Sequence, residues 1–123
     1  MSDVYETKEN PLRIKSYKFA LRMIKLYRHL VEEKREFVLS KQVLRSATSI
    51  GANIEEANQA ESKADFIHKL AISHKEAFET NYWLRLLRDS DYINHKLAQS
   101  LLCDCEEVQK LLTASLKTLK SNS

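Results

Sequence analysis

Seven residues in the second half of the chain recur at alternating steps of four and three, and this spacing constrains the fold most. They are Phe66, Leu70, Ser73, Ala77, Thr80, Leu84 and Leu87. A mean step of about 3.5 residues places them on one side of an α-helix and is the period of left-handed bundle packing. The middle of this side carries only small residues, which favours close approach of a partner helix. We therefore predict an all-α fold in which this segment packs within a bundle.

Capping signals divide the chain into four helices. Asn10 and Pro11 suit the N-cap and first position of a helix that runs to about residue 33. Ser40 is predicted to cap a helix that ends near residue 60, and Ser62 one that ends near residue 89. Asn94 is predicted to cap a fourth helix that ends near residue 119.

The links between these helices are short, so consecutive helices must run antiparallel. The prediction is an up-down-up-down four-helix bundle. One domain over residues 10–120 would be flanked by tails at residues 1–9 and 121–123. The whole chain has one glycine and one proline in 123 residues, which leaves little turn chemistry for a β-fold.

Cellular location and thiol chemistry are also constrained by the sequence. No apolar run approaches the roughly 18 residues that span a bilayer, and the first residues lack an apolar signal segment, so we expect a cytoplasmic protein. Cys103 and Cys105 are two positions apart on a predicted helix and therefore point to nearly opposite sides. They are not expected to pair with each other or to chelate one ion.

The second predicted helix contains an uncharged stretch at residues 46–54, in a chain that is 30% charged. Ser46, Ser49 and Asn53 form a polar side without charge, which suits a surface covered by a neighbouring helix. Gly51, the chain's single glycine, costs about 1 kcal/mol of helix propensity at this place. We predict that two helices approach closely at Gly51.

This stretch also carries a family resemblance. Three segments resemble a bacterial four-helix-bundle family whose genes occur in intervening sequences of large-subunit ribosomal RNA genes: residues 45–57 (RSATSIGANIEEA), 62–70 (SKADFIHKL) and 79–87 (ETNYWLRLL). The resemblance covers essentially the whole chain and implies a bundle that assembles. A more distant similarity is to the ring-shaped, pentameric accessory proteins of diversity-generating retroelements. That similarity implies a homopentamer that works with a reverse transcriptase and nucleic acid.

The first predicted helix has an apolar stripe turned away from its core-facing side. The stripe consists of Ile14, Tyr17, Leu21 and Ile24, and one bundle core cannot take both sides. An exposed apolar surface of this extent usually marks an interface, so we predict these residues to be the oligomer interface. The alternative, that flanking residues of the same chain cover the stripe, stays open.

The same helix carries only positive charges between residues 11 and 31: Arg13, Lys15, Lys18, Arg22, Lys25 and Arg28. Cations over the opening turn of a helix are mildly unfavourable, so this basic strip calls for another explanation. Contact with nucleic-acid phosphates is one, and we predict these six residues to be the nucleic-acid-binding site. The alternative is a solvated face whose long side chains cover apolar neighbours.

Enzyme chemistry lacks its usual patterns. Di-iron bundles need Glu-x-x-His pairs, and the chain has none. It also has no Gly-x-Ser-x-Gly elbow and no glycine-rich phosphate loop. We therefore predict a non-enzymatic protein without metal or cofactor. Two functions remain open: an oligomeric nucleic-acid-binding accessory protein, and a protein-interaction scaffold without a nucleic-acid role.

Overall fold

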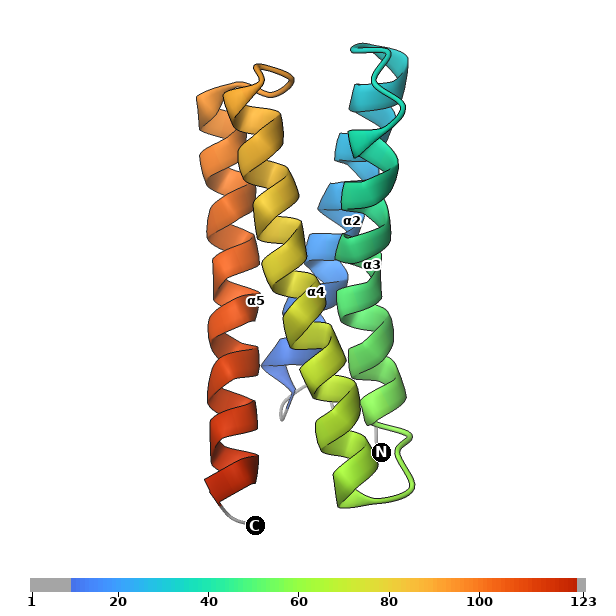
Figure 1. Ribbon diagram of the computed structural model, residues 1–123, viewed down its shortest axis with the longest axis vertical. Helices are drawn as coiled ribbons and strands as arrows, with labels where there is room; N and C mark the ends of the chain where they lie inside the picture. Colours follow the sequence, from blue (N-terminus) through green and yellow to red (C-terminus); the bar gives the residue numbers. More distant parts are fainter. Residues whose placement is uncertain (1–9, 122–123) are drawn as a thin grey trace.

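The computed structural model describes residues 10–121, which form four α-helices joined by short connections. They are α2 (Pro11–Glu32), α3 (Leu39–Ala57), α4 (Lys63–Asp89) and α5 (His95–Ser121). The helices lie alongside one another along the long axis of the molecule (Figure 1). The described part of the chain contains no strand, so the predicted all-α four-helix bundle is confirmed.

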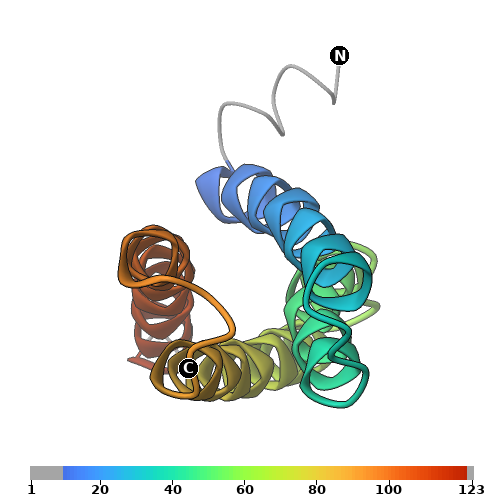
Figure 2. The ribbon, with the colours of Figure 1, turned by 90° about the horizontal axis from the view of Figure 1, so that it is seen from above.

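Each helix packs against the next one in the chain, and α5 returns to α2. Seen along the bundle, the order around it is α2, α3, α4, α5 (Figure 2). The backbones of helices on opposite corners do not approach each other, and the contact between α2 and α5 is the least extensive of the four. The α2–α5 side is therefore the side on which side chains are covered least by a neighbouring helix.

Three of the four predicted N-caps are confirmed. The side chain of Asn10 accepts a hydrogen bond from the N–H of Arg13 at 3.1 Å, with Pro11 at the first helical position. Ser62 accepts from Asp65 at 3.1 Å in the same way. The Oδ1 of Asn94 accepts from the N–H of Leu97 at 2.8 Å. Local sequence therefore determines where α2, α4 and α5 begin.

The predicted cap Ser40 is wrong. The helix α3 begins at Leu39, so Ser40 lies inside its first turn, and Val38 before it makes no side-chain cap. Instead, the carboxylate of Glu36 accepts hydrogen bonds from the N–H groups of Val38, Leu39 and Ser40 at 3.1, 2.9 and 2.7 Å. A carboxylate from the preceding connection thus satisfies the donors that a serine was expected to satisfy.

The core is completed by small polar residues between α3 and α4. Ser73 donates to the carbonyl of Ile50 at 2.8 Å, and Thr80 Oγ1 lies 2.8 Å from Ser46 Oγ. Ser46, Ser73 and Thr80 are completely buried, and no buried side-chain N or O atom in the described residues lacks a partner. These small side chains let α3 and α4 pack closely.

The close approach predicted at Gly51 is confirmed. A Cβ atom placed on Gly51 would lie 3.6 Å from Ser16 Oγ and 3.8 Å from the Ser16 carbonyl oxygen. At this point the backbone of α2 therefore lies within van der Waals distance of the first side-chain atom that a larger residue would carry.

Candidate nucleic-acid interface and assembly surfaces

The basic strip of α2 is divided by its surroundings into two halves. Lys18, Lys25 and Arg28 are exposed and form no ion pair with any residue between 10 and 121. The remaining three, Arg13, Lys15 and Arg22, are only half-exposed. On a helix that turns about 100° per residue, Lys18 and Lys25 lie within about 20° of each other. They form an exposed positive pair on one side of α2.

Acidic side chains from neighbouring helices form ion pairs with the other half of the strip. Arg22 pairs with Asp104 at 2.7 Å and Lys15 pairs with Glu107 at 3.0 Å, both on α5. Arg13 pairs with Glu55 of α3 at 2.7 Å and also takes part in a further contact.

The sequence did not predict these pairs, because the acids lie about 40 to 90 positions away from the bases. One signal was present. Where two helices run antiparallel side by side, the numbers of residues that face each other add up to a nearly constant value. The two ion pairs between α2 and α5 follow this rule, with sums of 122 and 126. Three of six predicted binding cations therefore have acidic partners at the edges of the strip.

The predicted interface stripe lies beside the exposed lysines. Tyr17 is 65% and Leu21 is 49% exposed, whereas Ile14 and Ile24 are half-buried. Thus Tyr17 and Leu21 expose about half or more of their surface to solvent, and the other two residues border them. Arg28 falls among these residues on the helical wheel, so a partner that covers the stripe would also cover Arg28.

A second apolar surface lies on α4. Phe78 is 52% and Tyr82 is 47% exposed, with the guanidinium of Arg85 5.7 Å from the centre of the Tyr82 ring. His74 packs edge-on against Phe78 with ring centres 4.9 Å apart. Burial lowers the pKa of His74, and Lys120 lowers it further, so this ring is neutral near pH 7. The His74 ring therefore adds no charge to this aromatic surface.

The tip between α2 and α3 is a third apolar surface, which sequence reasoning missed. Phe37 is 47% and Val38 is 70% exposed, and Arg35 stacks its guanidinium 5.6 Å from the centre of the Phe37 ring. Two adjacent large apolar residues in a connection, next to cations, were the available signal.

An ionic cluster joins the outer edges of α3 and α4. Glu79 accepts a hydrogen bond from the indole N–H of Trp83 at 2.9 Å and forms an ion pair with Arg45. The Trp83 hydrogen bond lowers the pKa of Glu79 most; burial opposes this, and Arg45 lowers it further. Arg45 also reaches Glu76 at 3.3 Å. The cluster fixes the indole ring and holds α3 against α4.

Comparison with known proteins places the chain in a family. The model of the 23S rRNA-intervening sequence protein matches residues 8–114. The chain belongs to this family. A crystal structure of a protein of unknown function from the S23 ribosomal protein family of Bacteroides thetaiotaomicron is 54% identical to it. The alignment covers 89% of this chain and 98% of that one, with a TM-score of 0.87. The comparison with curated proteins found no match to this chain.

Membership of the 23S rRNA-intervening sequence protein family accounts for the fold but names no activity, since the solved relative is itself described as having unknown function. All six predicted binding cations and all four predicted interface residues lie within the matched range.

Two further features of the described residues bear on function. No helix between residues 10 and 121 is long and apolar enough to cross a membrane. Within the same residues, no three His, Cys, Asp or Glu side chains are grouped so that they could hold a metal ion.

Proposed function

We propose that this member of the family is a non-enzymatic accessory protein that assembles with copies of itself and binds the backbone of RNA or DNA through α2. The observation that carries the proposal is the exposed pair Lys18 and Lys25, which has no acidic partner among the described residues and lies beside the exposed stripe of Tyr17 and Leu21. Burying the stripe between subunits would bring several lysine pairs near one another, whereas one chain offers a single such pair.

The mechanism is electrostatic. Each lysine that replaces a counterion condensed on a phosphate adds affinity that falls as salt rises, and it requires no contact with a base edge. Arg22 and Lys15 can join, because surface ion pairs contribute only about 0–1 kcal/mol and exchange readily. We therefore expect binding with little sequence preference. A closed ring, which by resemblance is a pentamer, would multiply the number of phosphate contacts by the number of engaged subunits.

The test is a titration of single-stranded RNA and of duplex DNA at increasing salt, with the wild type and two double variants. Lys18→Glu with Lys25→Glu reverses the exposed pair. Lys41→Glu with Lys110→Glu is the matched control, since both residues are exposed and lie on α3 and α5. Each double variant changes the formal net charge from +3 to −1, because every substitution subtracts two.

We expect the α2 variant to bind much more weakly and with a shallower slope of log affinity against log salt. The slope should fall by about 0.9 for each duplex phosphate that the variant no longer binds. The control should keep the wild-type slope. Equal losses in both variants would attribute binding to net charge alone, and absence of binding by the wild type even at low salt would refute the proposal.

Assembly is tested separately by native mass spectrometry of Leu21→Glu and Gln99→Glu. Both introduce one negative charge at an exposed position, but only Leu21 lies in the stripe. We expect Leu21→Glu to give monomers of unchanged helix content and Gln99→Glu to keep the wild-type oligomer. A monomeric wild type, or an intact Leu21→Glu oligomer, would remove the stripe from the interface.

A protein-interaction scaffold is the second candidate, and the aromatic surface of Phe78 and Tyr82 favours it. This surface lies on α4, which is not a neighbour of α2 around the bundle, so a protein partner bound there would not depend on the basic strip. If the wild type assembles but binds neither nucleic acid, the scaffold becomes the better hypothesis.

A further inference from the structure

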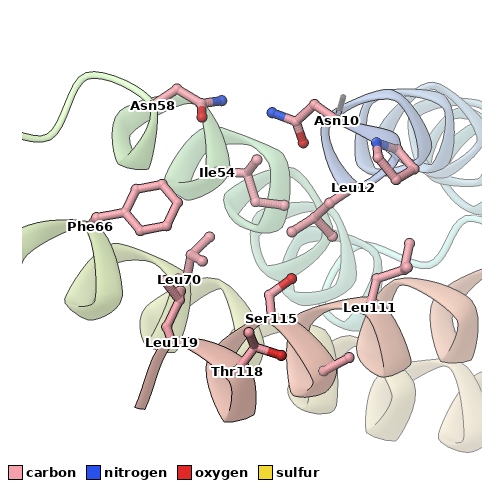
Figure 3. A pocket seen from close by; sticks show the side chains of 12 residues that line it. Asn10, Leu12, Ile54, Asn58, Phe66, Leu70, Leu111, Ser115, Thr118 and Leu119 are labelled. Atoms are coloured by element: carbon pink, nitrogen blue, oxygen red, sulfur yellow. The ribbon is translucent and has the colours of Figure 1, made fainter. Parts of the chain in front are cut away.

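A pocket lies at the end of the bundle where α2 and α4 begin and α3 and α5 end (Figure 3). Its volume is about 470 Å³, which is within the usual range of roughly 300–1,000 Å³ for sites that bind small molecules. All four helices contribute apolar side chains to it: Leu12, Ile54, Phe66, Leu70, Leu111 and Leu119. The pocket includes the start of α2 and the end of α5, the two neighbouring helices that contact each other least.

The polar groups of the pocket are few and uncharged. Asn10, Asn58, Ser115 and Thr118 are the hydrogen-bonding side chains among the lining residues, and none of the lining residues is Asp, Glu, Lys, Arg or His. In Figure 3 the amides of Asn10 and Asn58 point toward each other above the apolar residues. The Oδ1 of Asn10 already accepts the N–H of Arg13, which leaves its amide nitrogen as a hydrogen-bond donor on this side.

Ser115 differs from the other three polar groups, because Asn58 and Thr118 are exposed to solvent and Asn10 already accepts a hydrogen bond. Hydroxyls elsewhere in the helices, such as those of Thr48, Ser49 and Thr113, donate to the carbonyl one turn earlier at 2.7–2.8 Å. The hydroxyl of Ser115 makes no hydrogen bond to any described residue, although the side chain is only half-exposed and lines the pocket. It is free to donate to, or accept from, a bound molecule.

We propose that this pocket binds a neutral, amphipathic small molecule, with an apolar chain or ring system among the leucines and one polar group at Ser115 and Asn10. Apolar lining favours an apolar body at about 25 cal/mol per Å² buried. An ionised group placed here would lose its hydration without gaining an opposite charge, which is costly. The ligand class is therefore an uncharged alcohol, amide or ester. This proposal does not depend on nucleic-acid binding.

The experiment uses the full chain and the neutral dye Nile red, whose emission shifts to the blue and intensifies in an apolar site. Octan-1-ol and octanoate then compete with the bound dye at equal concentration, at neutral pH. These competitors have the same chain length and differ in the charge of the polar group. We expect octanol to displace the dye at a concentration at least about tenfold lower than octanoate, because only octanoate brings a charge.

Two variants of α5 locate the site. Ser115→Phe fills the pocket, and Ser100→Phe makes the same change at an exposed position outside the pocket. Circular dichroism must first show equal helix content for both. We expect Ser115→Phe to abolish the dye signal and Ser100→Phe to keep it. Ser115→Ala should keep dye binding but weaken octanol competition roughly two- to tenfold through the lost hydrogen bond.

Three results would overturn the proposal. The first is the absence of a blue-shifted signal with the wild type. The second is an undiminished signal with Ser115→Phe, which would place the dye on another apolar surface such as that of Phe78. The third is equal competition by octanol and octanoate, which would refute the neutral ligand class.

Discussion

Glu36 is predicted to anchor the start of α3, although it lies outside that helix. Glu36 is only 9% exposed, and its two carboxylate oxygens accept hydrogen bonds from the N–H groups of Val38, Leu39 and Ser40 at 2.7–3.1 Å. In addition, Ser40 Oγ donates to the Glu36 carbonyl at 2.8 Å. No other side chain caps this helix, because Val38 offers none. One carboxylate therefore accepts hydrogen bonds from three of the four N–H groups that any helix leaves without a partner inside the helix at its start.

Two substitutions at Glu36 separate the charge from the hydrogen bonds. Glu36→Gln keeps an acceptor oxygen but removes the negative charge at the positive end of the helix. Hydrogen bonds to charged groups contribute about 1.5–3 kcal/mol and neutral ones about 0.5–1.5, so we expect a loss of about 1–2 kcal/mol in the free energy of unfolding. Glu36→Ala leaves all three N–H groups without their partner and should cost about 2–4 kcal/mol.

The pH dependence of this loss provides the refuting experiment. Burial raises the pKa of Glu36, but the backbone donors of Leu39, Ser40 and Val38 outweigh it and hold the pKa below its ordinary value of 4.5. A depressed pKa in the folded state means that the stabilisation is fully present above 4.5 and is lost as the pH falls through the folded value. The difference between wild type and Glu36→Gln should therefore be constant near neutrality and shrink below pH 4.5.

Urea denaturation, followed by circular dichroism at fixed protein concentration from neutral pH to about 3, measures this difference. Glu33→Gln is the control, because Glu33 is exposed in the same connection and its side chain has no partner among the described residues. The reasoning is refuted if Glu33→Gln costs as much as Glu36→Gln, or if the Glu36→Gln difference is the same at acid and neutral pH.

Two further predictions concern packing and burial. Gly51→Ala should leave the free energy of unfolding unchanged or raise it by up to about 1 kcal/mol, because the added Cβ meets Ser16 at ordinary contact distance. Gly51→Leu should lower it by about 1–3 kcal/mol, because the larger side chain overpacks against α2. Urea denaturation distinguishes these outcomes, and a stabilising Gly51→Leu contradicts them. Burial raises the pKa of Cys105 to about 12, with Glu106 and Asp104 adding to the shift, while Cys103 is exposed. A thiol reagent at neutral pH should therefore modify one cysteine per native chain and two in denaturant; two in the native chain would show that Cys105 is accessible.

The fold could be predicted because its determinants are local. Of the seven residues spaced by four and three, six are buried along α4, and the seventh, Phe66, is half-buried beside the core. The helix starts at Asn10, Ser62 and Asn94 depend on side chains only three residues from the N–H groups they accept. Helical spacing and capping act within one or two turns, so a single sequence contains them.

The start of α3 could not be predicted in the same way. Glu36 reaches the helix because the chain turns at Arg35, whose φ is 54°, in the left-handed region that non-glycine residues seldom adopt. No residue-type pattern signals that turn, whereas Ser40 fits the usual cap preference. The conformation of the connection therefore decides which side chain caps α3, and the preference for serine at the N-cap does not.

The basic strip illustrates the corresponding limit for the candidate site. The run of cations from Arg13 to Arg28 is visible in the sequence, but its accessible charge depends on which residues of α3 and α5 face it. That depends on the relative rotation and axial offset of whole helices. These are set by core packing, so the surface potential is a tertiary property that the sequence of α2 alone does not determine.

If the strip binds phosphates, its acidic neighbours oppose binding, and removing them should strengthen it. Asp104→Asn with Glu107→Gln breaks two surface ion pairs, which costs little stability, and removes two negative charges beside the strip. A charge at about 8 Å in water contributes about 0.5 kcal/mol before screening, so affinity at low salt should rise about three- to fivefold.

The control for this gain is Glu61→Gln with Glu106→Gln, two exposed acids away from the strip that raise the formal net charge by the same amount, from +3 to +5. Fluorescence anisotropy with labelled single-stranded RNA at two salt concentrations compares both double variants with the wild type. A gain confined to Asp104→Asn with Glu107→Gln, and lost at high salt, assigns the phosphates to α2, because nearby charges act through short-range fields that salt screens. An equal gain in the control assigns it to net charge. No gain in either variant contradicts phosphate binding at the α2–α5 edge, and the two ion pairs then serve only to hold α5 against α2.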